Sequence, residues 1–215
     1  MCSVAVALDG EVLALKELNE RNIHASQITL FIDEVMKSAD KKYSQLDAIA
    51  ISKGPGSYTG LRIGVSTAKG LCFGLDIPLI SVNTLEAMAS GFIQGYPDFD
   101  PQTILCPMID ARRMEVYTAI FDTKLHCLET VNAKVLDRQT FESYLSRHPM
   151  VFFGDGAEKS RTLYAEYPNY KFVEFENSAA HLSSIALNKL VNNETENVAY
   201  FEPFYLKDFI PGVSK

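Results

Sequence analysis

The feature that most restricts how this sequence can fold is a glycine-rich stretch at residues 54–64, which reads GPGSYTGLRIG. Gly54 and Gly56 permit backbone angles that are closed to other residues, and the proline between them fixes a turn. A serine or threonine directly after such a turn can cap a helix. We therefore predict that a strand ends here and that a helix follows, from about Ser57 to Gly74.

Small side chains recur at every fourth position of this predicted helix. They are Gly56, Gly60, Gly64, Ala68 and Cys72. Glycine inside a helix costs about 1 kcal/mol relative to alanine, so the repeat favours close approach by another backbone. A glycine-rich turn at a helix N-terminus can also bind an anion. Packing is the commoner use of such turns, and the Walker pattern of a P-loop does not occur in the sequence.

Strand and helix patterns alternate along the sequence, which is typical of the α/β class. Besides the helix above, we predict strands at residues 2–8, 11–18, 46–52, 77–82, 103–109, 115–121, 131–136 and 150–153. Helical patterns cover residues 24–39, 84–90, 138–147, 158–166 and 181–191. Glycine and proline in residues 91–101 favour a boundary there. We expect an N-terminal unit of residues 1–97, joined by a C-terminal segment of about 200–215, and a C-terminal unit of residues 98–199.

The composition argues against several classes of protein. The net charge is −7 and the sequence has no run of basic residues, so the chain alone is a poor candidate for binding RNA. No apolar run reaches the roughly 18 residues that a membrane-crossing helix needs, and the first residues show no signal-peptide pattern. The 4 cysteines form no C-x-x-C pair, which favours free thiols in a reducing compartment. We expect a cytoplasmic protein with no membrane contact.

Residues 54–64, continued through Leu71, closely resemble the signature of the TsaB (YeaZ) family. The similarity is dense from Cys2 to Gly91 and then thins to islands at residues 110–117, 154–157 and 202–206. It implies an actin-like, sugar-kinase-like (ASKHA) fold of two α/β lobes. Family members normally begin with a further strand, whereas this sequence opens where the second strand is expected. We therefore expect a first sheet without its first N-terminal strand.

The resemblance also implies a role without chemistry of its own. Members of the family bind and stabilise the related enzyme TsaD, together with TsaE, in the synthesis of threonylcarbamoyladenosine on tRNA, and TsaD carries the metal and the reaction. We therefore expect a heterodimer with TsaD, a ternary complex with TsaE, and a homodimer when the chain is alone. Contact with tRNA is expected only through the complex. We expect no cofactor, no metal and no catalytic residue in this chain.

The sequence gives only weak support for a metal-binding or catalytic role of any candidate residue. The resemblance aligns the metal-binding stretch of TsaD with residues 83–88, so that Thr84 and Met88 stand where histidines bind the metal. A hydroxyl and a thioether are poor replacements for imidazole. Ser66 and Lys69 match a Ser-x-x-Lys pattern, but the supporting motifs are missing and Ser66 falls within a predicted helix. We interpret both as solvated side chains of that helix.

Two polar stretches each keep two interpretations. The stretch Asp110-Ala111-Arg112-Arg113 can form an anion site, because paired arginines bind phosphate or carboxylate. Alternatively, it is a turn at a strand end whose exposed arginines pair with Glu115 or neighbouring acids, which we favour because local ion pairing requires no ligand. Gly154-Asp155-Gly156-Ala157 follows an apolar strand. In related kinase-like folds such a turn lies near the nucleotide, and here it can equally be only a turn with a helix cap.

The predicted partner interface uses the helices at residues 24–39 and 57–74, which the resemblance implies pack against the same pair in TsaD or in a second copy. At 100° per residue, one face of the second helix carries Arg62, Val65, Ser66, Lys69 and Phe73. On the first helix, Leu30 lies outside the core stripe beside Glu34 and Lys37. Apolar side chains flanked by charges suit a specific interface. The alternative is that Leu30 and Phe73 are ordinary exposed side chains.

Two rival functions remain open. The first is a nucleotide- or metal-dependent enzyme of the same superfold, either a kinase-like ATPase or an M22-type peptidase. The replaced histidines and the unmatched first phosphate turn argue against this class. The second is a homodimeric structural or regulatory module unconnected to tRNA, which failure to bind TsaD would favour.

Overall fold

The strands of this chain form three sheets in the computed structural model, which describes residues 1–19 and 24–207. The largest sheet has five strands, in the order β7 (Cys127–Val135), β6 (Glu115–Phe121), β5 (Ile104–Asp110), β8 (Met150–Phe153) and β9 (Tyr170–Val173). β6 is antiparallel to both of its neighbours, whereas β5, β8 and β9 run parallel. The chain therefore has the mixed α/β fold that the alternating pattern predicts.

Both faces of the five-stranded sheet are buried, because side chains of its central strands alternate between two apolar clusters. On one face Leu85 and Phe92 pack on the sheet from helix α3 (Thr84–Gly95). On the other face Phe152 and Tyr164 belong to the second cluster. Each such side chain contributes roughly 1.5–3 kcal/mol when fully buried. That face is covered by α4 (Glu142–Leu145), η2 (Ala157–Ser160) and α5 (Arg161–Tyr164).

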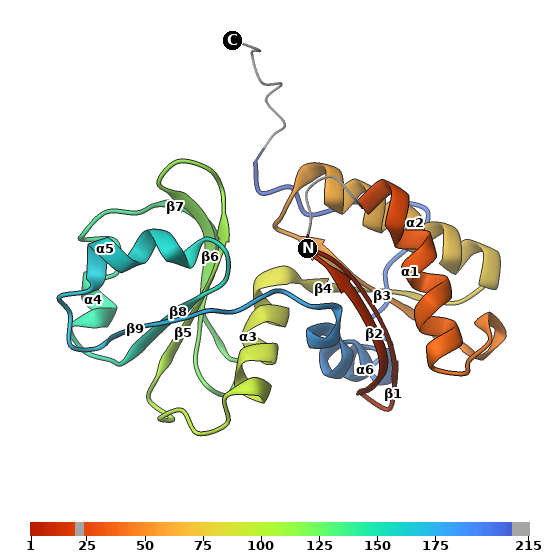
Figure 1. The fold of residues 1–215 in the computed structure, drawn as a ribbon, viewed down its shortest axis with the longest axis horizontal. Coiled ribbons are helices and arrows are strands. Elements are labelled where there is room, and N and C mark those ends of the chain that lie inside the picture. Colours follow the sequence, from red (N-terminus) through yellow and green to blue (C-terminus); the bar gives the residue numbers. More distant parts are fainter. Residues whose placement is uncertain (20–23, 208–215) are drawn as a thin grey trace, which may run out of the picture.

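Two smaller sheets lie on the opposite side of α3 (Figure 1). They are the antiparallel hairpin of β1 (Cys2–Leu8) with β2 (Glu11–Leu18), and the parallel pair of β3 (Ile49–Gly54) with β4 (Leu79–Asn83). Two helices cover them, α1 (His24–Ser38) on the hairpin and α2 (Tyr58–Leu75) on the parallel pair. Val35 and Met36 of α1 pack against Val6, and Ala68 and Cys72 of α2 are buried on the parallel pair.

Helix α6 (Ser183–Val191) and the 3-10 turn η3 (Ala179–Leu182) return to the N-terminal strands. Leu182 and Ile185 pack against Val82 of β4 and Ala87 of α3. Figure 1 shows α6 beside β1 and β2, on the side away from α1 and α2. The expected division puts these residues in a C-terminal unit of residues 98–199, whereas their main contacts with other helices and strands are with N-terminal elements.

Several predicted elements have the expected bounds, and others differ for local reasons. The strands at 115–121 and 150–153 match, and α2 begins directly after Ser57, whose Oγ accepts a hydrogen bond from the Gly60 amide. The helix expected at 138–147 is limited to α4, because Asp137 Oδ1 accepts hydrogen bonds from the amides of Gln139 and Thr140 in a turn. The helix expected at 158–166 is divided between η2 and α5, and β9 is not predicted. Among the described helices, none is both long and apolar enough to cross a membrane.

The small-residue ridge of α2 packs against side chains. A Cβ atom on Gly64 would lie 3.3 Å from Cδ1 of Ile51 in β3, and Ala68 and Cys72 are buried with Leu79 of β4. The prediction of a close backbone is therefore wrong at Gly64. The ridge instead sets how closely the helix approaches the side chains of β3 and β4.

We expect Gly154→Ala to lower the free energy of unfolding by about 2 kcal/mol. Gly154, directly after β8, has a φ of +97°, and a Cβ atom there would collide with the carbonyl oxygen of Met108. Gly70→Ala in α2 is the matched control, because beyond its chain neighbours and the backbone of its own helix no described atom lies within 4 Å of the added methyl group. Helix propensity should make this control more stable by up to about 1 kcal/mol. Urea unfolding measures both, and wild-type stability of Gly154→Ala would contradict the geometry.

His181 in η3 makes the stability of the protein depend on pH. Its ring stacks on Phe175, with ring centroids 4.9 Å apart, and packs against Gly91 of α3. Burial lowers the pKa of the imidazole below its usual 6.5, against the smaller opposing effect of the Glu17 carboxylate. The unfolded chain therefore binds this proton more readily than the folded chain. The packing of the neutral imidazole therefore stabilises the folded state fully above pH 6.5. This contribution to the free energy of unfolding is lost as the pH falls below that value.

We expect the thermal midpoint of the wild type to fall more steeply on acidification from about pH 7.5 to about pH 5.5 than that of His181→Phe. The phenylalanine keeps an aromatic ring against Phe175 and has no proton to bind. His148→Phe, at an exposed position, is the control and should keep the wild-type slope. Melting curves recorded across this range by circular dichroism test the prediction, and parallel curves for the wild type and His181→Phe would refute it.

Candidate partner interface

The outer face of α2 carries a large exposed apolar side chain. Phe73 is 87% exposed, and Arg62 and Ser66 are exposed on the same side of the helix. The Arg62 guanidinium lies 5.0 Å from the centroid of the Tyr58 ring, one turn earlier, which orients it along the helix. These three residues of the predicted interface therefore share an exposed surface.

Two other predicted residues of α2 lie elsewhere. Val65 is 3% exposed, so its predicted place on an exposed face is wrong. Lys69 is half-buried, and its ammonium group donates hydrogen bonds to the carbonyl oxygens of Ala199 at 3.1 Å and Phe201 at 2.9 Å. At 100° per residue Val65 lies about 60° from Arg62, at the border of the outer face, whereas Lys69 lies only about 20° from Arg62, within that face. Whether other segments of the chain cover these two residues depends on tertiary contacts.

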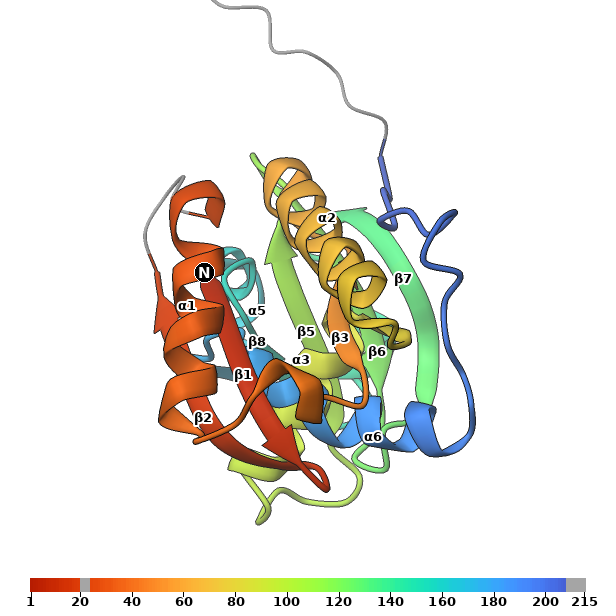
Figure 2. The same cartoon turned by 90° about the vertical axis from the view of Figure 1, so that its right-hand side faces the viewer.

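The predicted residues of α1 are exposed. Leu30 is 53% exposed, and Glu34 forms an ion pair with Lys16 of β2 at 2.8 Å. Lys37 is exposed in the last turn of the helix. α1 contacts α2, and Figure 2 shows the two helices next to each other. One partner could therefore cover the outer faces of both helices.

Thr84 and Met88, which the resemblance places at metal-binding positions, are packed inside the fold. The hydroxyl groups of Thr84 and Ser52 share a hydrogen bond of 2.6 Å. Met88 is buried beside Gly154. Within residues 1–19 and 24–207, no group of three His, Cys, Asp or Glu side chains is arranged to hold a metal ion. Both side chains are thus engaged in packing and hydrogen bonding at the start of α3.

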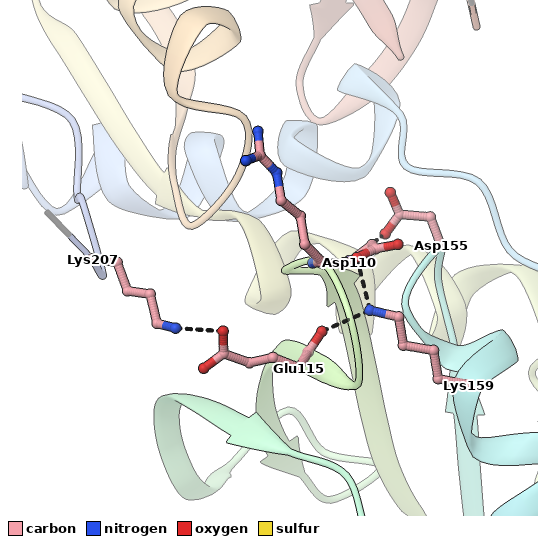
Figure 3. A network of polar contacts seen from close by, with 6 residues as sticks. Asp110, Glu115, Asp155, Lys159 and Lys207 are labelled. Carbon is pink, nitrogen blue, oxygen red and sulfur yellow. Dashed lines mark hydrogen bonds and ion pairs between the residues drawn. The ribbon is translucent and has the colours of Figure 1, made fainter. Parts of the chain in front are cut away.

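A cluster of charged side chains joins the ends of β5, β6 and β8, as Figure 3 shows. Lys159 donates hydrogen bonds of 2.8 Å to Asp110 Oδ1 and to the Glu115 carbonyl oxygen. Asp155 Oδ1 accepts a hydrogen bond of 3.0 Å from the Asp110 amide. The Glu115 carboxylate forms an ion pair with Lys207. The turn at residues 154–157 is therefore tied to the end of β5.

The charges of this cluster determine the ionisation of Asp110. Burial disfavours its carboxylate, but the hydrogen bond from Lys159 and the one from the Arg112 amide outweigh this and lower the pKa of Asp110. The predicted pairing of Arg112 and Arg113 with Glu115 or nearby acids is wrong. Lysines pair with those acids, and in the described part of the chain neither arginine forms an ion pair. Both arginines are exposed, with φ values of 72° and 49°.

The C-terminal segment, here residues 197–207, connects this cluster with α2. Besides its contacts to Lys69 and Glu115, the Phe204 amide donates a hydrogen bond of 2.7 Å to the Lys53 carbonyl oxygen. The rest of the expected segment, residues 208–215, lies outside the described residues. Sequence reasoning missed the roles of Lys159 and Lys207. Hydrogen bonds to carbonyl oxygens and ion pairs over long sequence distances leave no local pattern, although the island at 202–206 marks part of the segment.

Comparison with known proteins identifies relatives of this chain. A family model described as TsaD, tRNA N6-adenosine threonylcarbamoyltransferase, matches residues 16–209. The tRNA threonylcarbamoyladenosine biosynthesis protein TsaB of Haemophilus influenzae is 40% identical over 116 residues, which are 54% of this chain and 47% of that protein. TsaB of Bacillus subtilis is 34% identical over 142 residues, 61% of this chain and 59% of that protein. The chain thus spans about half the length of the curated relatives it matches.

The fold also has a close counterpart among solved structures. The structure of YeaZ from Pseudomonas aeruginosa superimposes with a TM-score of 0.75, covering 95% of this chain and 94% of that one, at 23% identity. This likeness concerns the fold. The match to the family model covers most of the chain, and the curated relatives carry the TsaB name. The chain therefore belongs to the TsaD family of tRNA N6-adenosine threonylcarbamoyltransferases, in its TsaB (YeaZ) group.

Proposed function

We propose that this chain is a non-catalytic accessory subunit in the synthesis of threonylcarbamoyladenosine on tRNA, and that it binds and stabilises the catalytic subunit TsaD. The names of its curated relatives support the pathway. The match to the family model of the transferase itself supports a shared architecture. A two-fold contact uses the same surface patch on both subunits, so a related partner that carries an equivalent patch can replace the second copy.

The observation that carries the proposal is the exposed outer face of α1 and α2. Phe73 and Leu30 are large exposed apolar side chains, and Arg62, Glu34 and Lys37 are exposed charges of both signs on the same two helices. A central aromatic anchor with a polar rim is the usual composition of a protein–protein contact. The composition of this surface therefore suits docking of a partner protein.

The accessory role acts through differential binding. A subunit that binds the competent conformation of TsaD more tightly than other conformations shifts TsaD toward that state. This mechanism requires no chemistry from the accessory chain. It agrees with the engagement of Thr84 in a hydrogen bond to Ser52 and of Met88 in packing.

The finer assignments belong to the same proposal. The chain has an actin-like, ASKHA-type fold of two lobes, divided near residues 97–98, with residues 179–207 returning to the first lobe as the contacts of η3, α6 and Lys69 suggest. TsaE joins the TsaD complex as a third subunit, and the isolated chain forms a homodimer. The complex contacts tRNA, and the chain does so only through it. The protein works in the cytoplasm, where free thiols such as buried Cys106 persist.

We expect Phe73→Ala to weaken binding to TsaD by about tenfold or more, because truncating a central aromatic anchor commonly costs at least about 1.4 kcal/mol. Arg62→Glu should weaken it as well, by reversing a charge on the same face of α2, about three turns from Phe73. Isothermal titration with purified TsaD measures both effects. Val135→Ala on β7 is the matched control, since Val135 is a 66% exposed apolar side chain of the five-stranded sheet.

Lys69 is unsuitable as a probe of this contact, because its substitution would also release the C-terminal segment. Affinities of Phe73→Ala and Arg62→Glu equal to that of the Val135→Ala control would reject the outer face of α1 and α2 as the binding surface. Such a result would not bear on the pathway assignment, which the following experiment tests.

We expect tRNA threonylcarbamoylation by TsaC, TsaD and TsaE to depend on this chain. Incorporation of labelled threonine into tRNA should be at least about tenfold higher with the chain than without it, since a shift of 1.4 kcal/mol changes a population tenfold. The chain alone should neither modify tRNA nor hydrolyse ATP. Turnover of ATP or of a peptide by the isolated chain would favour the enzyme alternative.

A further inference from the structure

The turn between β5 and β6 holds two arginines in an unfavourable backbone conformation. Arg112 has a φ of 72° and Arg113 a φ of 49°, so both lie in the left-handed region. This region is uncommon for residues that carry a side chain, and hairpin turns that need it generally use glycine, asparagine or aspartate. Backbone outliers of this kind gather where a protein binds a ligand or switches between states. The side chains of these two residues are therefore the first candidates for a role beyond the fold.

The conformation of this turn does not depend on the two guanidinium groups. The Arg112 amide donates a hydrogen bond of 2.5 Å to Asp110 Oδ1, and the Glu115 amide donates one of 3.1 Å to the Arg112 carbonyl oxygen. The Ala111 amide donates a further bond of 3.1 Å to the Glu115 carbonyl oxygen. All three donors are backbone amides. Within residues 1–19 and 24–207, neither guanidinium has a hydrogen bond, an ion pair or an aromatic ring to stack on.

The carboxylates around the turn already have other partners. Asp110 pairs with Lys159 at 2.8 Å, and Glu115 pairs with Lys207. Asp155 accepts a hydrogen bond from the Asp110 amide (Figure 3). Together with the two arginines, these lysines give four cations beside three carboxylates at this end of the sheet. The turn is thus a local excess of positive charge in a chain whose net charge is −7.

The exposure of the turn favours an extended anion over a small enclosed one. Arg112 and Arg113 are both exposed, and neither lines the cavity of about 510 Å³ beside Phe99 or the one of about 530 Å³ beside Val6. A planar guanidinium presents paired N–H donors that match two oxygens of a phosphate group. Two adjacent guanidinium groups on an open surface therefore suit a chain of phosphates, such as the backbone of a nucleic acid.

The turn also lies beside the proposed contact with TsaD. Lys207 is tied to the turn through Glu115, and two residues earlier the Tyr205 ring lies 4.8 Å from the Tyr58 ring, between ring centroids, in the first turn of α2. The C-terminal segment therefore brings the turn close to the start of α2, whose outer face carries the docking residues. A nucleic acid bound to a partner on that face can extend onto the turn.

We propose that Arg112 and Arg113 bind backbone phosphates of the tRNA on which the complex acts. The inference rests on the proposed function, because TsaD brings the tRNA to this chain. The net charge of −7 opposes binding of RNA by the chain alone, so the turn adds to an affinity that the complex provides. Phosphate contacts position a nucleic acid and carry no sequence information, so the turn strengthens the binding of tRNAs of different sequence alike.

The test variant is Arg112→Gly combined with Arg113→Gly, which removes both charges and suits the left-handed backbone. The matched control is Lys124→Ala combined with Arg147→Ala. These two residues are also exposed, and they lie at the opposite end of the five-stranded sheet, after β6 and before β8. Urea unfolding should show the glycine variant to be at least as stable as the wild type, whereas a structural role of the arginines requires it to be less stable.

The first measurement is the affinity of the complex reconstituted with TsaD and TsaE for fluorescently labelled tRNA. At about 0.1 M salt we expect the glycine variant to bind at least about tenfold more weakly than the control variant. The slope of log Kd against log salt concentration should become shallower by about 2, one for each lost phosphate contact. Threonylcarbamoylation should show a raised KM for tRNA and an unchanged kcat, because the arginines touch no reacting atom.

The second measurement needs no TsaD. The isolated chain is titrated into a labelled RNA oligonucleotide of about twelve nucleotides at about 20 mM salt, where charges are weakly screened. We expect weak binding, with a Kd at least about threefold higher for the glycine variant than for the control variant. If the wild-type chain does not bind TsaD, the proposed function fails and this measurement alone decides the inference.

Two results would overturn the inference. The first is equal affinity of the glycine and control variants for tRNA in the complex or, where no complex forms, for the oligonucleotide. The second is loss of TsaD or TsaE from the glycine variant in size-exclusion chromatography, which would assign the turn to an acidic protein surface. Failure of the wild-type complex to modify tRNA would count against the proposed function and would leave both binding measurements valid.

Discussion

The packing of α2 on β3 is the contact on which the rest of this structure depends. Gly54 makes it possible, because its φ of +118° turns the chain from the strand into the helix. A side chain at this position would also place its Cβ atom 2.6 Å from the Phe204 carbonyl oxygen. The same glycine therefore permits the C-terminal segment to cross the turn. Strand, helix and segment are thus held together at one residue that has no side chain.

Local features of the fold could be predicted from the sequence, whereas features that depend on distant segments could not. The start of α2 follows from the capping chemistry of Ser57, and the bounds of β6 follow from an apolar run. The burial of Val65 and the engagement of Lys69 depend on elements far away in the sequence. Periodicity assigns a residue to a face of its helix. It does not say which faces the rest of the chain covers.

The two sides of α2 differ in chemistry. The outer face carries exposed apolar and charged side chains, which suits a partner that is itself folded. The inner side packs on the fold, with Gly64 against Ile51 of β3 and with Ala68 and Cys72 buried beside Leu79 of β4. A partner bound to the outer face is therefore separated from β3 and β4 by a single helix.

The C-terminal segment is a strap whose two anchors differ in physical character. At one end the Lys69 ammonium donates hydrogen bonds to two backbone carbonyl oxygens, which carry no net charge. At the other end Lys207 meets Glu115 at the surface, and such pairs weaken as ionic strength rises. A rise in salt concentration should therefore release the C-terminal segment from β6 before it releases the segment from α2. The charged cluster at the end of β5 would then lose its tether while the helix kept its own.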